Sequence, residues 1–244
     1  YSNMKKIRLD DLLIERGEAH DKKEAFIFVT EGRVFVNGQK AVSPAQLVTD
    51  ADKIEVHPVR EFVGRGAYKL EAALEKFAVD VRGKVCADIG SAVGGFVEVL
   101  LKHGAKRVYA IDTARGKLDL KLRGDPRVVV MEETDVRSLS ELGEAVALVT
   151  TDVSLISLRE ILPKVRRYMS EEGEVIALFK PQYATRDQSI RRHGVVKDDA
   201  ARQQLLYDFI KWAENNGWKV TERMESPILG GEGNVEYLLY LKQQ

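Results

Sequence analysis

Hydrophobic residues near the beginning of the chain recur at helical spacing. Leu9, Leu12 and Leu13 fall on one face of a helix that the pattern predicts over residues 8–17, and Gly17 fits the C-cap of that helix. The chain is therefore expected to open with a short amphipathic helix.

A second helix and a hairpin are predicted next. Residues 20–32 have the pattern of another short helix, with Asp21 as its N-cap. Residues 33–41 then alternate between apolar and polar positions around an Asn-Gly pair at 37–38, which is the strongest short hairpin signal in a sequence. Residues 52–57 supply a further strand.

After residue 69 the pattern changes, and apolar strands alternate with amphipathic helices. This alternation is typical of a doubly wound, mostly parallel α/β sheet. The last strand follows its predecessor too closely for a helical crossover, so we expect it to pair antiparallel. The predicted strands lie at 85–90, 107–112, 128–132, 147–152, 174–180, about 218–225 and 236–242.

The two patterns divide the chain into two predicted domains. Residues 4–58 form a small α+β module, and residues 67–244 form the larger α/β domain. Residues 59–66, which include Gly64 and Gly66, are typical of a linker between domains.

Composition indicates a globular protein without a membrane span. Hydrophobic residues make up 44% of the chain and charged residues 31%, and no apolar run approaches the roughly 18 residues of a transmembrane helix. The single cysteine, Cys86, excludes an intramolecular disulfide, and no signal peptide precedes the first helix, so we expect a cytoplasmic protein. The 38 basic and 38 acidic residues balance, so a nucleic-acid interface must rest on local patches.

The stretch ADIGSAVGGFVEVLLKHGAKRVYAIDT, residues 87–113, runs a strand into a glycine turn, a helix and a second strand that ends in an acid. A dinucleotide fold needs Gly-x-Gly-x-x-Gly at such a turn, with the pyrophosphate on the helix N-terminus. Here the glycines are Gly90, Gly94 and Gly95, and Ser-Ala stands where the second glycine is required. Asp88, at the end of the strand, would repel a phosphate but suits a cation. The pattern therefore favours S-adenosylmethionine, which carries a sulfonium and an ammonium and no phosphate.

Three acids are placed to hold that ligand. Asp88 would face the methionine end, and Asp112, which ends the second strand, would take both ribose hydroxyls. Asp135 is a candidate for the adenine amino group, although a loop acid that faces solvent explains it equally well. For the whole set, ordinary turn residues and an N-cap are the alternative interpretation. The predicted S-adenosylmethionine site consists of Asp88, Gly90, Ser91, Gly94, Gly95, Phe96, Asp112 and Asp135.

Two routes of methyl transfer lack the residues that they require. Cys86 lies inside the first strand, where a buried inert thiol is expected rather than a nucleophile for methylation of a base carbon. The segment TDVSLIS after strand four lacks the Asn or Asp followed by Pro-Pro and an aromatic residue that methylation of a base amino group often uses. The fold instead brings charged residues from four places to one end of the sheet: Lys69, Asp152, Lys180 and Glu236.

These four residues resemble the Lys-Asp-Lys-Glu tetrad of the FtsJ-type RNA ribose 2′-O-methyltransferases. From Met4 to about Leu241 the chain resembles the TlyA family, also called haemolysin A proteins, and the match is carried in order by RLDDLLIERG, GRVFVNG, GRGAYKLEAAL, DIGSAVGGF, DVSLISLREILP, LFKPQY, HGVVKD and GNVEYLLYL. The resemblance implies a Rossmann-like, seven-stranded methyltransferase domain, preceded by an RNA-binding module similar to that of ribosomal protein S four. It also implies methyl transfer from S-adenosylmethionine to the 2′-hydroxyl of cytidine in ribosomal RNA.

The tetrad indicates how a ribose hydroxyl would be activated. Such a hydroxyl is a very weak acid, so a base that takes its proton assists attack on the methyl group. Lys180 is the expected base, because a like charge on Lys69 and partial desolvation favour its neutral form. Asp152 would hold Lys180 in line, and Glu236 would orient either Lys69 or the hydroxyl. A surface cluster of ion pairs is the alternative interpretation.

Residues 4–66 carry eleven basic and eleven acidic side chains, so an RNA-binding face requires these charges to segregate, with Glu15, Glu18 and Glu24 turned away. The second helix starts with Asp-Lys-Lys at 21–23, where the family usually has Ser-Arg. For each single residue, a solvated surface side chain is the alternative. The predicted RNA contacts are Lys5, Lys6, Arg8, Lys22, Lys23, Arg33, Arg60 and Arg65.

Other classes of function stay open at this point. The four histidines lack ligand spacing, so no metal is expected, and a monomer is the default. An RNA-binding assembly factor without the chemistry is one alternative, and the membrane-lytic protein implied by the family's older name is another. Because the linker runs straight into the helix that carries Lys69, we expect it to couple RNA docking to donor binding; a passive tether is the alternative.

Overall fold

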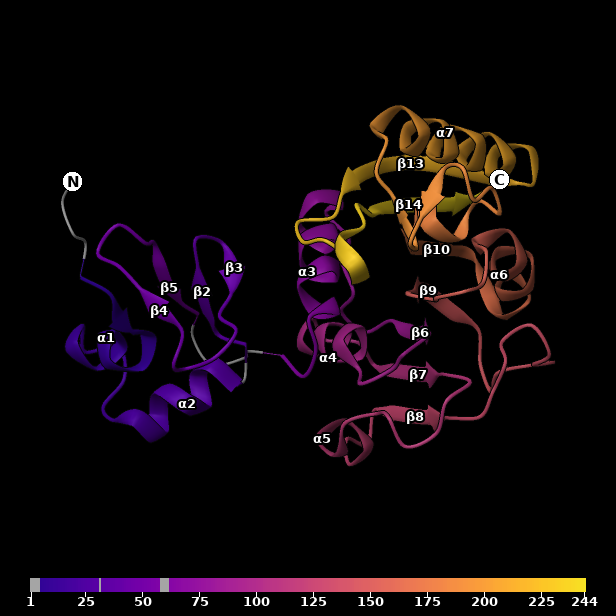
Figure 1. The fold of residues 1–244 in the computed structure, drawn as a ribbon. Helices are drawn as coiled ribbons and strands as arrows, with labels where there is room; N and C mark the ends of the chain where they lie inside the picture. Colours follow the sequence, from indigo (N-terminus) through magenta and orange to yellow (C-terminus); the bar gives the residue numbers. More distant parts are fainter. Residues whose placement is uncertain (1–4, 31, 58–61) are drawn as a thin grey trace. The chain divides into compact units, whose positions relative to one another are not determined.

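The computed structural model describes residues 5–30, 32–57 and 62–244. The chain forms two compact units, Tyr1–Glu61 and Phe62–Gln244 (Figure 1). Of the predicted linker at 59–66, residues 59–61 lie outside the described residues. Residues 62–66 belong to the larger unit, where Phe62 is buried in the hydrophobic core.

The smaller unit contains the helices and the hairpin that the sequence predicts. Asp21 caps the second helix, because its Oδ1 accepts a hydrogen bond from the backbone N–H of Glu24 at 2.8 Å. Asn37 and Gly38 both have positive φ, as a primed hairpin turn requires. The elements are β1 (Ile7–Arg8), α1 (Leu9–Glu15), α2 (Lys22–Thr30), β2 (Val34–Val36), β3 (Gln39–Lys40), β4 (Leu47–Val48) and β5 (Ile54–Val56).

Two small sheets hold these elements together. Strand β2 pairs antiparallel with β3 and β5, and β1 pairs antiparallel with β4. The β1–β4 ladder does not follow from the sequence pattern, because two residues are too few to show a period. The shared core lies between the helices and the strands and includes Leu9, Leu12, Leu13, Ala25, Val29, Val34 and Val48.

The larger unit is built on one seven-stranded sheet with the order β13-β14-β10-β9-β6-β7-β8. Strands β10, β9, β6, β7 and β8 run parallel, and β14 pairs antiparallel with β10 and with β13. The predicted fold class and the antiparallel last strand are therefore confirmed. The strands are β6 (Val85–Ile89), β7 (Arg107–Ile111), β8 (Val128–Met131), β9 (Val146–Thr151), β10 (Met169–Phe179), β13 (Trp218–Glu225) and β14 (Tyr237–Gln243).

Helices cover both faces of this sheet. One face packs against α3 (Gly66–Phe77), α4 (Gly95–Lys102) and α5 (Leu120–Arg123), and the other packs against α6 (Leu158–Val165) and α7 (Asp199–Asn215). The remaining elements are a short hairpin, β11 (Arg191–Arg192) with β12 (Val195–Val196), and three 3-10 turns, Arg166–Tyr168, Pro181–Tyr183 and Gly231–Gly233.

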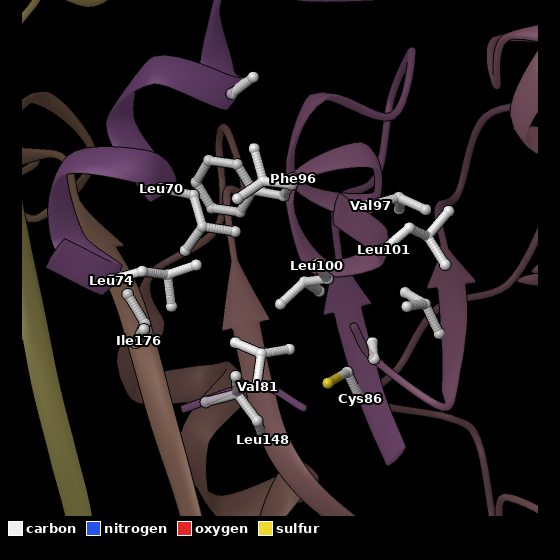
Figure 2. Packing of buried hydrophobic residues seen from close by; sticks show 14 of the residues in the cluster. Leu70, Leu74, Val81, Cys86, Phe96, Val97, Leu100, Leu101, Leu148 and Ile176 are labelled. Carbon is white, nitrogen blue, oxygen red and sulfur yellow. The ribbon is translucent and has the colours of Figure 1, made fainter. Parts of the chain in front are cut away.

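Figure 2 shows the core on the first face. Leu70 and Leu74 of α3 and Leu100 of α4 lie over the side chains that the strands direct toward them, Cys86 among these. The prediction of a buried cysteine is confirmed, and burial raises the pKa of the Cys86 thiol to about 12, which disfavours the reactive thiolate. Within the described residues, no helix is both long enough and apolar enough to cross a bilayer.

Candidate active site

The carboxyl ends of the parallel strands meet at one edge of the sheet, and four predicted site residues follow them directly. Gly90 follows β6, Asp112 follows β7, Asp152 follows β9 and Lys180 follows β10. Strand β14 runs the opposite way and starts at this edge, with Glu236 just before it. Strand direction alone therefore gathers residues that are far apart in the sequence.

Lys180 and Asp152 form an ion pair at this edge. Lys180 Nζ lies 2.6 Å from Asp152 Oδ1, and the two side chains are 11% and 27% exposed. The ammonium also donates to Ser154 Oγ at 3.1 Å. Lys180 is therefore fixed by two oxygens and keeps a small exposed fraction.

Lys69 and Glu236 form the second ion pair. Lys69 Nζ lies 2.6 Å from Glu236 Oε1, and the side chains are 10% and 1% exposed. Glu236 is thus closed off from solvent, whereas Lys69 is not entirely so. Since β14 pairs with β10 in a register that places Tyr237 opposite Phe179, Glu236 also lies beside the strand end that carries Lys180.

A cavity of about 330 Å³ opens next to Asp152. Its volume lies in the range of small-molecule sites. Its walls come mainly from the loops that follow β6, β7, β8 and β9, with Gly90, Asp112, Asp135 and Asp152, and Ile161 of α6 adds to them.

A smaller cavity of about 90 Å³ adjoins the first and shares Gly90, Ala92 and Asp152 with it. Its other lining residues are Gly64, Arg65, Gly66, Asp88, Ser91, Val93, Gly95 and Phe96. The two cavities together form an elongated cleft along the carboxyl edge of the sheet.

Asp88 gives the smaller cavity its chemistry. The carboxylate is buried, Oδ1 accepts a hydrogen bond from Thr150 Oγ1 at 2.8 Å, and Oδ2 has no partner in the described part of the chain. Burial raises the pKa of Asp88 to about 8, and the nearby charges of Asp152 and Asp112 act in the same direction. An unpartnered, desolvated carboxylate beside a cavity fits a cationic ligand, such as the ammonium of an amino acid moiety.

Gly90 lets the backbone of the cleft pass close to the strand beside it. Its φ is +83°, and a Cβ atom there would lie 2.2 Å from the Asp152 carbonyl oxygen. Gly94 has a different role, because a Cβ there would meet Leu118 and Leu122. Gly94 is the one predicted ligand residue that lines neither cavity.

Asp112 and Asp135 both line the larger cavity, and both carboxylates already accept hydrogen bonds. Asp112 accepts from the backbone N–H of Ala92 at 2.7 Å and of Ala114 at 2.8 Å, which ties the glycine turn to the loop after β7. Asp135 is paired with Arg137, with Nη2 and Oδ2 at 2.7 Å. Each carboxylate oxygen has a second lone pair, so both acids keep acceptor capacity for a ligand.

The predicted RNA contacts fall in both units. Lys5, Lys6 and Lys23 are exposed, and Arg8 and Lys22 both approach Asp11. Arg33 lies over the Phe28 ring, 4.0 Å from its centroid, and donates to the His57 carbonyl at 3.0 Å. Arg65 belongs to the larger unit and donates to the Leu229 carbonyl, and Arg60 lies outside the described residues.

Three polar residues that sequence reasoning did not select contact the predicted ones. They are Thr150, Ser154 and Gln182, which bind Asp88, Lys180 and Glu236 respectively. Ser154 and Gln182 lie inside the family segments DVSLISLREILP and LFKPQY. Each stands two residues after a tetrad member, which is the only sequence signal for them. Among the described residues, no group of three or more His, Cys, Asp or Glu side chains is arranged to hold a metal ion.

The sheet order, the helices on both faces and the charged cleft at the carboxyl edge define a Rossmann-like methyltransferase. Residues 62–243 match the FtsJ-like methyltransferases as a family, and the chain belongs to this family. The 16S/23S rRNA (cytidine-2′-O)-methyltransferase TlyA of Mycobacterium tuberculosis is 39% identical, over 98% of this chain and 91% of its own length.

Two further proteins extend the similarity over nearly the whole chain. Hemolysin A of Brachyspira hyodysenteriae is 36% identical, over 96% of this chain and 99% of its own length. A solved structure of a protein named as a hemolysin from Streptococcus thermophilus is 33% identical with a TM-score of 0.76, and the match covers 99% of this chain and 90% of that one. The resemblance to the TlyA family that the motifs carry is therefore confirmed, and the protein is a methyltransferase.

Proposed function

We propose that this protein transfers a methyl group from S-adenosylmethionine to the 2′-hydroxyl of a cytidine in ribosomal RNA. The observation that carries the proposal is the position of Asp152. It lines the cleft together with Asp88, whose Oδ2 has no partner in the described part of the chain, and it binds Lys180 at 2.6 Å. The Lys69–Glu236 pair lies at the same end of the sheet, beside Lys180. The TlyA protein of Mycobacterium tuberculosis supports the choice of nucleotide, since its name gives cytidine-2′-O methylation of ribosomal RNA.

The cleft offers a complementary group for each part of the methyl donor. Asp88 would bind the ammonium, Asp112 the ribose hydroxyls and Asp135 the adenine amino group, while Gly90, Ser91, Gly95 and Phe96 form the walls between them. The donor's sulfonium supplies the methyl group and departs as a neutral sulfide. S-adenosylmethionine carries no phosphate, which agrees with the turn's lack of the second glycine of the Gly-x-Gly-x-x-Gly fingerprint.

Lys180 is the proposed general base. It would accept the proton of the ribose hydroxyl as the oxygen attacks the methyl carbon, and Asp152 would hold the nitrogen in line and stabilise the ammonium that forms. Ser154 adds a second contact that fixes the direction of the nitrogen.

Burial supports one of the two roles that the sequence leaves open for Glu236. A carboxylate that is 1% exposed cannot reach a hydroxyl of an RNA substrate, whereas it touches Lys69 at 2.6 Å. We therefore assign Glu236 to the orientation of Lys69. Lys69 in turn would supply positive charge beside the reacting oxygen.

The smaller unit is the proposed RNA-binding module. It presents exposed Lys5, Lys6 and Lys23, which are suited to phosphate contacts. Such contacts fix the position of an RNA without reading its sequence, so they fit recognition of a large folded substrate.

The test is incubation of the full chain with labelled S-adenosylmethionine and isolated ribosomal subunits, followed by mapping of the labelled nucleotide. The expected result is a single labelled cytidine that resists alkaline hydrolysis, because its 2′-oxygen is blocked. Label on a base, on protein, or nowhere would overturn the proposal.

A further inference from the structure

Gln182 has a fixed place beside Lys180. It lies in the 3-10 turn Pro181–Tyr183 that follows β10, in which the N–H of Tyr183 donates to the Lys180 carbonyl at 3.0 Å. Arg191 Nη1 donates to the Gln182 carbonyl at 2.9 Å. The backbone of Gln182 is therefore held on both sides, and its side chain, only 4% exposed, points inward.

The side-chain amide of Gln182 faces the carboxylate that holds Lys69. Its Nε2 lies 3.4 Å from Glu236 Oε2, while Glu236 Oε1 binds Lys69. Within the described residues these are the two side-chain groups that donate to Glu236. A buried carboxylate is stable and fixed in direction only when donors meet its oxygens, so Gln182 completes the surroundings of Glu236.

Packing alone does not explain why the side chain at position 182 carries an amide. Gln182 Oε1 is buried and has no hydrogen-bond partner in the described part of the chain, which disfavours folding. A neutral hydrogen-bond donor has a specific advantage at this place. A second cation would compete with Lys69 for Glu236, and a carboxylate would repel the Glu236 carboxylate.

We propose that Gln182 is a positioning residue that acts through Glu236. Gln182 lies in the backbone turn that follows Lys180, so its contact with Glu236 fixes Lys69 relative to Lys180. The inference rests on the proposed function. Gln182 itself touches neither the donor nor the reacting hydroxyl, and it acts only on the direction of the Glu236 carboxylate.

The first test uses Gln182→Leu in the full chain, with isolated ribosomal subunits as substrate. Loss of a hydrogen bond to a charged group is expected to lower kcat about ten- to a hundredfold. The affinity for S-adenosylmethionine and the melting temperature should stay at the parent values. The substitution removes the unpartnered Gln182 Oε1 and leaves Glu236 Oε2 without its donor, so the number of unpartnered buried oxygens is unchanged. Gln204→Leu is the matched control, since Gln204 is an exposed glutamine on α7 that binds Asp208.

A double-mutant cycle separates the proposed route from others. In a Glu236→Gln background, Gln182→Leu should cost no further activity, because the carboxylate through which Gln182 acts is gone. Additive losses would overturn the inference.

Gln182→Glu supplies a readout that a purely structural role would not move. At neutral pH two carboxylates face each other and kcat should fall below that of Gln182→Leu. As the pH falls, the protonated carboxyl becomes a donor, so the ratio of kcat to the parent value should rise. A constant ratio, or parent activity in Gln182→Leu, overturns the inference, whereas a parent enzyme that labels no ribose overturns the proposed function instead.

Discussion

Lys69 Nζ lies 2.6 Å from Glu236 Oε1, although 167 residues separate the two in the sequence. The contact joins the first turns of α3 to the start of β14. Glu236 is almost wholly buried, so its charge is balanced inside the protein and its position depends on the groups that pack around it. One of these groups is the backbone of Gly230.

Gly230→Ala is expected to disrupt the Lys69–Glu236 pair. A Cβ atom at Gly230 would lie 2.1 Å from Glu236 Oε2, so the carboxylate must move. Methyl transfer should fall at least tenfold, as a displacement of about 1 Å near a reacting centre can cost far more. Gly231→Ala is the control, because nothing lies within 4 Å of a Cβ atom there. Equal activities of the two variants would show that this pair is not required.

The sequence predicts the charged residues of this site better than the uncharged side chains that contact them. Asp152 and Lys180 follow apolar strands whose parallel order was readable from the alternation of strands and helices, so their meeting at 2.6 Å follows from topology. Gln182 and Ser154 are uncharged and follow no period. Their roles depend on side-chain directions that only tertiary packing sets.

The elements that the pattern misses are missed for a related reason. Strands β1 and β11 contain two residues each, and a period of two needs more positions to be visible. Strand β10 begins at Met169, five residues before the predicted start, because its first part contains Glu171, Glu172 and Gly173 and lacks an apolar alternation. Hydrophobic pattern thus reports only the portion of a strand that the core covers.

Lys180→Ala is expected to abolish most of the methyl transfer without loss of donor binding. Removal of a general base typically costs about a hundredfold to ten-thousandfold in kcat. Raised pH should not restore the rate, since within the described residues Lys180 is the one amine paired with the Asp152 carboxylate. Single-turnover rates with labelled donor measure this, and Lys211→Ala on α7 is the control. Activity near that of the parent at raised pH would remove Lys180 from the role of base.

Asp88 predicts how stability depends on pH. Its pKa is raised from 3.8 to about 8, mainly by burial, so between these values the folded state binds a proton that the unfolded state has released. The free energy of unfolding must then fall as the pH rises through this window. Melting curves of the ligand-free protein and of Asp88→Asn should diverge toward higher pH, with the variant the more stable. Parallel curves would contradict the assignment.

The same carboxyl links donor binding to proton release. An ammonium that binds Asp88 stabilises its charged form, so S-adenosylmethionine binding near pH 7 should release a proton. Calorimetry in two buffers of different ionisation enthalpy measures this release. Asp88→Asn should abolish it and weaken the donor, while Asp208→Asn, an exposed acid on α7, should do neither.

Asp112→Ala is expected to weaken the binding of S-adenosylmethionine, because it removes charge-assisted hydrogen bonds to the ribose worth about 1.5–3 kcal/mol each. The change also frees the N–H groups of Ala92 and Ala114, which loosens the turn. Glu132→Ala controls for this effect: Glu132 holds the N–H of Gly116 in the same loop and lines neither cavity. Calorimetric affinities that agree between Asp112→Ala and the parent would exclude Asp112 from the site.

The contacts of the segment from Phe62 to Gly66 favour a coupled connector over a passive tether. Phe62 is buried and packs edge-on against Tyr68, with ring centroids 5.5 Å apart, and the N–H of Val63 donates to Glu98 Oε2 at 2.6 Å. Gly64 and Gly66 line the smaller cavity beside Asp88. These contacts place the end of the connector in the wall of the proposed donor site.

Loss of this segment should therefore weaken the binding of the methyl donor as well as the binding of RNA. A chain that begins at Phe62 is expected to bind S-adenosylmethionine like the full chain, whereas one that begins at Ala67 should bind it at least tenfold less tightly, because the wall of the smaller cavity is gone. Phe62→Ala in the full chain tests the same point without a deletion. It removes a buried ring, a change that costs about 3–5 kcal/mol of stability in a well-packed core, so affinity is compared below the melting temperature of the variant. A passive tether predicts equal donor affinity in all four proteins and a loss of RNA affinity in the two shortened ones, since only those lack the smaller unit.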